Sequence, residues 1–104
     1  MARALEIKET LVEGEHVLAL VGCVDTNTAP QLEAVAARIY AIDAAPRIVV
    51  DLAECTFLSS AGLRVIVTMQ KRATRGGSLR FCNVTPSIRE VFDSTGFSKI
   101  LTFA

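Results

Sequence analysis

The stretch that decides the fold, residues 46–77, reads PRIVVDLAECTFLSSAGLRVIVTMQKRATRGG. Residues 48–52 are apolar and rich in β-branched side chains, a pattern typical of a buried strand. A short crossing over residues 53–58 is expected next. Apolar residues then recur at helical spacing, which predicts a helix over 60–75 that ends at Gly76-Gly77.

The expected start of this helix carries a serine, Ser60. A serine at a helix start can accept a hydrogen bond from a main-chain N–H that has no partner inside the helix. Ser60 also comes soon after a buried strand, a region of open α/β sheets where ligands and chemistry tend to gather. The sequence therefore singles out Ser60 as either a helix cap or a functional hydroxyl.

The rest of the chain alternates strands with helices. Two strands joined by a turn at Glu13-Gly14-Glu15 predict a hairpin, and the helix between two later strands predicts a parallel βαβ unit. The expected strands are 5–11, 16–21, 47–52, 79–84 and 99–103, the chain leaves the sheet at 22–25, and the expected helices are 29–43, 60–75 and 86–95. We expect one α/β domain with a mixed four- to five-stranded sheet and helices mainly on one face.

Composition fits a single globular domain. The 104 residues are 51% hydrophobic and 21% charged, with eleven acidic and eleven basic side chains. The chain lacks the excess of basic residues that is typical of proteins that bind nucleic acid or an anionic membrane. It also has no apolar run long enough for a signal peptide or a membrane span. We expect a soluble, cytoplasmic protein that needs no cofactor.

The cysteines and the histidine give no sign of a metal or disulfide site. Cys23, Cys55 and Cys82 are odd in number and form no C-x-x-C pair. We interpret them as small, mostly buried apolar side chains in a reducing compartment. The single histidine, His16, is expected at the hairpin end of its strand, far from Ser60, and no G-x-S-x-G motif is present. These features argue against a catalytic serine, so we expect no enzyme.

The motifs around Ser60 resemble the STAS domain family, in particular the bacterial anti-sigma factor antagonists. Asp51-Leu52, Phe57-Leu58 and Ser60-Ala61-Gly62-Leu63 follow the order and spacing of the family signature. The resemblance extends to 21–32 and 79–96 and covers nearly all of residues 1–104 as one STAS domain. The family usually has a further helix after the last strand. That helix is either absent here or not included in residues 1–104, and the surface beneath it is expected to be exposed or covered by a partner.

The resemblance implies a function for Ser60. In the family, the serine at this position is phosphorylated by a serine kinase of the histidine-kinase-like ATPase class that is also the anti-sigma factor or a switch protein. The unphosphorylated antagonist sequesters that partner, phosphorylation releases it, and a serine-phosphate phosphatase resets the switch. Ser59 stands where the family usually has Asp, so Ser59 is a second candidate hydroxyl, and the phosphorylation could be weaker, shifted or lost.

The resemblance also implies a docking surface around the serine, at which the partner kinase binds. We expect it to include Asp25, Thr26, Asn27, Thr28, Ser59, Ala61, Gly62, Arg64, Val65, Thr68 and Met69. Val65 and Met69 allow two interpretations, because they either belong to an apolar docking patch ringed by charge or pack under the neighbouring helix. Asp25 likewise lies beside the phosphorylation site in the family, or serves only as a turn or cap. Gly62 is expected to permit a close approach of the backbone.

Three functions remain open at this point. The favoured one is a phospho-switchable binding module that regulates transcription by partner switching. The second is a STAS domain that acts without phosphorylation, as a structural subunit of a transporter-associated or other multiprotein complex. The third is a sensor that binds a nucleotide or another anion at the helix end that carries Ser60.

Overall fold

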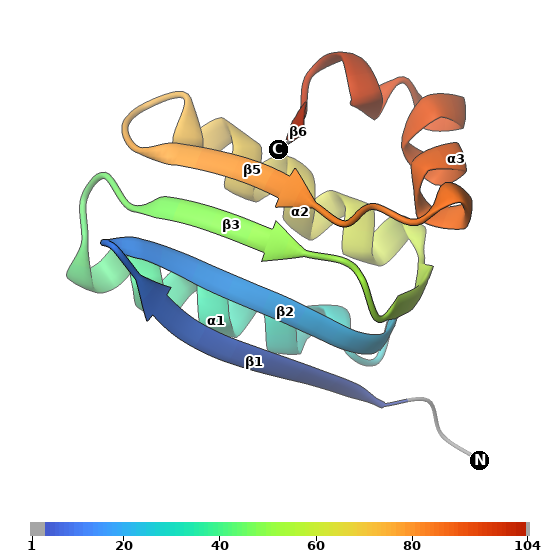
Figure 1. Ribbon diagram of the computed structural model, residues 1–104, viewed down its shortest axis with the longest axis horizontal. Helices are drawn as coiled ribbons and strands as arrows, with labels where there is room; N and C mark the ends of the chain where they lie inside the picture. Colours follow the sequence, from blue (N-terminus) through green and yellow to red (C-terminus); the bar gives the residue numbers. More distant parts are fainter. Residues whose placement is uncertain (1–3, 104) are drawn as a thin grey trace.

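Strands and helices alternate through most of the computed structural model, which describes residues 4–103 (Figure 1). Within this range the chain forms six strands, three α-helices and one 3-10 turn. They are β1 (Leu5–Val12), β2 (Glu15–Val24), α1 (Ala29–Ile42), β3 (Arg47–Asp51), β4 (Cys55–Leu58), α2 (Ser60–Ala73), β5 (Ser78–Cys82), α3 (Pro86–Thr95), η1 (Phe97–Lys99) and β6 (Thr102–Phe103). The expected mixed α/β architecture is confirmed.

The predicted hairpin joins β1 and β2 as an antiparallel pair, in which Val12 is opposite Glu15. The two residues between them, Glu13 and Gly14, have φ angles of 52° and 81°. Positive φ at both central positions is the geometry whose twist matches paired strands. The turn signal read from the sequence therefore marks a tight two-residue hairpin.

The sheet has the order β1-β2-β3-β5-β6, and β3, β5 and β6 run parallel to β2. The predicted parallel unit from β3 through α2 to β5 is confirmed. Figure 1 shows α1 and α2 together behind the sheet, with α3 at the end of it. The core lies between the sheet and the two long helices, and its largest fully buried side chains include Phe81, Phe92, Leu18, Leu20, Leu32, Ile48, Ile66 and Met69.

Two expectations about the strands are wrong, and the second of them brings the sheet to six strands instead of four or five. β2 continues to Val24, and the expected crossing contains β4, which pairs in parallel with the end of β2. The longer β2 and its pairing with β4 both depend on Gly22. This residue has a φ of 111° and lies where the register between β2 and β4 shifts. A Cβ at Gly22 would lie 2.3 Å from the carbonyl oxygen of Ala4, so only glycine fits there.

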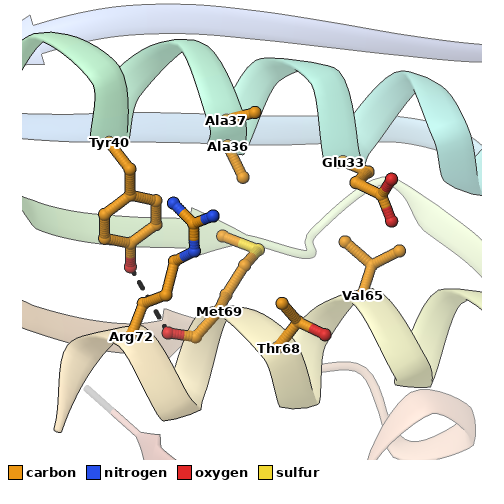
Figure 2. Close-up of a pocket in the computed structure, with 8 residues that line it drawn as sticks. All are labelled: Glu33, Ala36, Ala37, Tyr40, Val65, Thr68, Met69 and Arg72. Atoms are coloured by element: carbon orange, nitrogen blue, oxygen red, sulfur yellow. Dashed lines mark hydrogen bonds between the residues drawn. The ribbon is translucent and has the colours of Figure 1, made fainter. Parts of the chain in front are cut away.

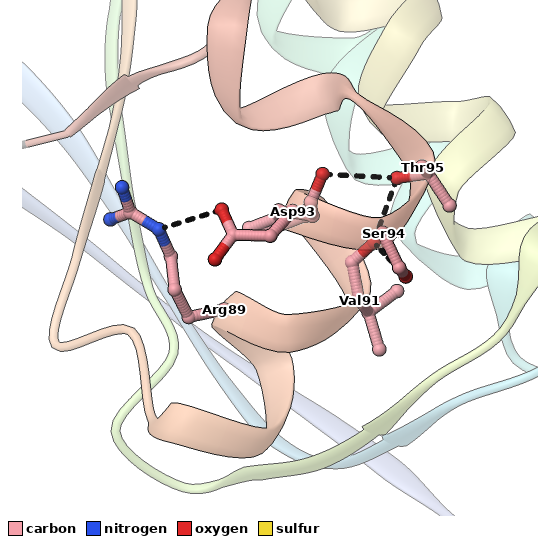
Figure 3. A network of polar contacts seen from close by, with 6 residues as sticks. Arg89, Val91, Asp93, Ser94 and Thr95 are labelled. Atoms are coloured by element: carbon pink, nitrogen blue, oxygen red, sulfur yellow. Dashed lines mark hydrogen bonds and ion pairs between the residues drawn. The ribbon is translucent and has the colours of Figure 1, made fainter.

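The C-terminal part packs through aromatic rings. The ring of Phe92 on α3 lies 5.8 Å from Phe81 and 6.0 Å from Phe103, measured between centroids. Polar contacts stabilise α3 itself, and Figure 3 shows the Arg89–Asp93 pair, at 3.3 Å, on its surface. The final strand, expected over 99–103, forms only at Thr102–Phe103 because the preceding residues make the 3-10 turn η1.

None of the helices in residues 4–103 has the length and apolar character needed to cross a membrane.

Candidate functional site

The ends of β2 and β4 hold two loops side by side. Val24 is opposite Leu58 in the parallel register, and the N–H of Ser59 donates to the carbonyl oxygen of Val24 at 2.8 Å. The chain then turns away at both points, into the loop 25–28 and into α2. The predicted docking residues 25–28 therefore lie beside the start of the helix that carries Ser60.

The loop 25–28 is held rigidly by its own polar side chains. The Asp25 Oδ1 accepts hydrogen bonds from the N–H groups of Asn27 and Thr28, at 2.9 and 3.0 Å. The Thr28 hydroxyl donates to the carbonyl oxygen of Cys23 at 2.7 Å and accepts from the N–H of Asp25 at 2.9 Å. Asp25 is thus a turn residue in this structure, and buried Thr28 fastens the loop to the end of β2.

The two serines at the start of α2 differ in their contacts. Ser59 is the N-cap, and its Oγ accepts from the N–H of Gly62 at 3.3 Å. The capping role expected for Ser60 therefore belongs to Ser59, one residue earlier. Ser60 is the first helical residue, and its side chain is exposed. Its hydroxyl makes no hydrogen bond to any residue within 4–103.

Gly62 allows α2 to approach the strands closely. A Cβ at this position would lie 2.7 Å from both the Leu58 Cδ1 and the Val24 Cγ1. The close approach is to side chains, whereas the sequence had suggested the backbone. Leu58 and Val24 are the last residues of β4 and β2, so this packing sets the distance between the first turn of α2 and the sheet.

Val65 and Met69 are 6% and 1% exposed, so they pack under the neighbouring helix and cannot form an apolar docking patch. Figure 2 shows them facing α1 across a small cavity of about 50 Å³. The Tyr40 hydroxyl donates to the carbonyl oxygen of Met69 at 3.3 Å, and the Arg72 guanidinium lies 4.9 Å from the Tyr40 ring centroid. Burial raises the pKa of Tyr40, and the charge of Arg72 opposes that rise.

The exposed surface around Ser60 has two hollows, one on each side of α2. A hollow of about 280 Å³ faces α1 and is lined by Thr26, Ala29, Pro30, Glu33, Ala61, Arg64, Val65 and Thr68. A second hollow of about 370 Å³ faces η1 and is lined by Ser60, Leu63, Arg64, Val67, Thr95 and Phe97. The sequence could not reveal the second hollow, because Thr95 and Phe97 reach it from a distant segment and Val67 resembles a core residue.

Two other polar residues lie away from this site. Asp51 is opposite Ala19 on β2, five residues before Val24, and its carboxylate accepts from the N–H of Ala53 at 3.0 Å and from the Asn83 side-chain amide at 3.1 Å. His16 lies at the hairpin end of β2, with its Nε2 4.0 Å from the Asp43 Oδ2. Val24 is eight residues further along β2 than His16, which corresponds to about 26 Å. The histidine therefore lies too far from Ser60 to act on its hydroxyl.

The thiols and acidic groups form no evident reactive centre. Cys23, Cys55 and Cys82 are free, and burial raises the pKa of the Cys55 and Cys82 thiols. Within residues 4–103, no three or more His, Cys, Asp or Glu side chains are placed to share a metal ion.

Known proteins share both the sequence pattern and this architecture. Residues 6–104 match the STAS domain family. A Bordetella bronchiseptica protein named "Putative anti-sigma factor antagonist BtrV" is 37% identical over 95 residues, which are 89% of this chain and 80% of that protein. An anti-sigma factor antagonist from Mycobacterium paratuberculosis is 25% identical, with a TM-score of 0.87 over 96% of this chain and 85% of that one.

The structure of the anti-sigma factor antagonist SpoIIAA in its unphosphorylated form has a TM-score of 0.80, with 21% identity over 95% of this chain and 88% of that one. This likeness concerns the fold. The family match spans almost the whole sequence, and the Bordetella relative is aligned over most of it. The chain therefore belongs to the STAS domain family and is related to the anti-sigma factor antagonists.

Proposed function

We propose that this protein is an anti-sigma factor antagonist controlled by phosphorylation of Ser60. When Ser60 is unmodified, the protein binds and sequesters an anti-sigma factor, and the sigma factor is released. When Ser60 is phosphorylated, the complex dissociates. The single observation that carries the proposal is the exposed, unbonded Ser60 hydroxyl at the start of α2, beside the loop 25–28.

The contacts at the start of α2 favour Ser60 over Ser59 as the modified residue. The Ser59 hydroxyl is engaged as the N-cap and its side chain is only partly exposed. A kinase would have to displace the Ser59 hydroxyl from the N–H of Gly62, and this cap is worth about 1 kcal/mol. A phosphate on Ser60 would leave that hydrogen bond in place.

A phosphate on Ser60 suits a switch that changes binding without changing the fold. It adds a charge of about −1.5 to −2. A helix N-terminus tolerates this charge because the free N–H groups of the first turn and the helix dipole stabilise an anion. At an interface, the same charge opposes a partner that fits the uncharged surface, and misplaced charge there costs several kcal/mol. Because about 1.4 kcal/mol changes affinity tenfold, a single phosphate suffices to release a partner.

The proposed docking surface consists of the loop 25–28 and the exposed residues of α2. It keeps Asp25, Thr26, Asn27, Ser59, Ala61, Arg64 and Thr68 near the phosphoacceptor. The buried residues have supporting roles: Thr28 holds the loop, Gly62 sets the position of the helix, and Val65 and Met69 pack α2 against α1. The partner is a serine kinase of the histidine-kinase-like ATPase class, and a serine-phosphate phosphatase reverses the modification. The protein acts in the cytoplasm as a binding module and not as an enzyme.

The test is mass spectrometry of the protein after incubation with such a kinase and ATP, alongside the Ser60→Ala and Ser59→Ala variants. We expect one phosphate, located on Ser60 by fragmentation and absent only from Ser60→Ala. Loss only from Ser59→Ala would move the site by one residue. Kinase binding without phosphate transfer to any variant would contradict the switch and leave docking alone. Neither binding nor transfer would favour the structural-subunit alternative.

A further inference from the structure

Arg64 lies between the two hollows that flank the start of α2. It is the residue common to the linings of both, and it follows Ser60 by four positions on the same helix. Its side chain is exposed. Residues four apart lie on one face of a helix with their Cβ atoms about 5–6 Å apart. A group attached to the Ser60 Oγ would therefore come within reach of the Arg64 guanidinium.

The Arg64 guanidinium is also available. Within residues 4–103, only Arg64 and Arg75 among the arginines have a guanidinium without a hydrogen bond, ion pair or ring contact. The other arginines are engaged: Arg38 with Glu9, Arg47 with the Glu13 carbonyl, Arg72 with Tyr40, Arg80 with Glu15, and Arg89 with Asp93 and Phe103. The Arg64 carbonyl oxygen accepts from the Thr68 hydroxyl at 3.1 Å, a main-chain contact that does not engage the guanidinium.

From this placement we infer that Arg64 binds the phosphate on Ser60 within the same chain. In the unmodified protein, Arg64 faces the two hollows and is open to an acidic group of a partner. After phosphorylation, its planar guanidinium pairs with the phosphate oxygens, a geometry in which two parallel hydrogen bonds form. Phosphorylation then acts twice, because it adds a negative charge and withdraws a positive one from the docking surface. This inference rests on the proposed phosphorylation of Ser60.

Glu33 is the acidic residue that shares a hollow with Arg64. No ion pair joins the two side chains in the structure, and a carboxylate carries one charge against nearly two on the phosphate. The phosphate is therefore the stronger partner for Arg64. The first N–H groups of α2 also stabilise the phosphate. Their effect is the same in every Arg64 variant, so it does not contribute to the difference between the variants.

The test measures the second ionisation of the phosphate by phosphorus NMR as pH is varied. Phosphoserine is incorporated at position 60 during translation, so the experiment needs no kinase. The proteins compared are the otherwise wild-type phosphoprotein, Arg64→Gln, Arg64→Lys and the matched control Arg75→Gln, which removes the same charge just beyond the C-terminal end of the helix. A nearby cation favours the dianion, so we expect the phosphate in Arg64→Gln to titrate a few tenths of a pH unit higher than in the parent.

The inference further requires Arg75→Gln to titrate like the parent and Arg64→Lys to fall between the parent and Arg64→Gln. Equal titration in the parent and Arg64→Gln would overturn it, as would an equal shift in Arg75→Gln. Failure of a kinase to phosphorylate Ser60 would contradict the proposed function without altering this NMR result. The two failures are therefore distinguishable.

Discussion

The N–H of Ser59 donates to the carbonyl oxygen of Val24 at 2.8 Å, and this bond extends the pairing of β2 with β4 to join two segments that are far apart in the sequence. It sets the start of α2 against the end of β2, so the loop 25–28 and the exposed Ser60 side chain share one surface. The site thus depends on main-chain contacts at the ends of two adjacent parallel strands. Side chains then hold each of the two segments in place.

Ser59 and Ser60 should contribute differently to stability, because only Ser59 caps the helix. We expect Ser59→Ala to lower the free energy of unfolding by about 1 kcal/mol. Ser59→Asp keeps an acceptor and adds a negative charge at a helix N-terminus, so it should match or exceed the wild type by up to about 1 kcal/mol. Urea denaturation measures both effects.

The control for this prediction is Ser60→Ala, whose exposed hydroxyl makes no bond in the described structure. Its unfolding free energy should lie within about 0.5 kcal/mol of the wild type. A larger loss in Ser60→Ala than in Ser59→Ala would show that the cap assignment is wrong.

Thr28→Val should loosen the docking loop. The substitution keeps the shape of the side chain but leaves the N–H of Asp25 and the carbonyl oxygen of Cys23 without the Thr28 hydroxyl. Because Thr28 is buried, we expect a cost of about 1–3 kcal/mol in unfolding free energy and faster amide exchange over 25–28. The exposed Thr26→Val is the matched control, and an equal cost in both variants would contradict this role for Thr28.

Tyr40 should make the protein less stable at alkaline pH. Burial raises its pKa above the ordinary value of 10.0, so the folded state keeps the phenol proton after the unfolded state has lost it. The free energy of unfolding should therefore fall as pH rises above about 10. Tyr40 is the only tyrosine, so the absorbance of its phenolate reports this ionisation directly.

Tyr40→Phe separates this effect from the titration of lysines. The variant loses the hydrogen bond to the Met69 carbonyl, which should cost about 0.5–1.5 kcal/mol near neutral pH. It should also lose stability less steeply than the wild type above pH 10. Parallel curves for the two proteins across that range would refute the assignment.

Local sequence patterns predicted those parts of the fold that depend on local chemistry. The turn at Gly14, the strand around Val50 and the helix that starts at Ser60 all follow from residue type and spacing. β4 could not be predicted in this way, because its pairing with β2 depends on the backbone of Gly22, more than thirty residues earlier. Gly22 suggested the end of a strand, whereas its positive φ lets β2 change register and continue.

The placement of the candidate site residues was predicted in outline and corrected in detail. The loop 25–28 and Ser60 do share a surface, but Val65 and Met69 are buried because α1 packs against that face of α2. Which face of a helix meets its neighbour is set by tertiary packing, and an apolar pair ringed by charge is compatible with either arrangement. The hollow beside Phe97 escaped prediction for the same reason, since it forms only where α3 and η1 meet α2.

The central claim is that a phosphate on Ser60 releases the partner, and calorimetric titration of the purified partner kinase tests it most directly. The titrants are the unmodified protein and the same protein carrying phosphoserine at position 60, with circular dichroism to verify that both are folded. We predict tight binding of the unmodified protein and at least about tenfold weaker binding of the phosphoprotein. Equal affinity of the two forms would contradict the account.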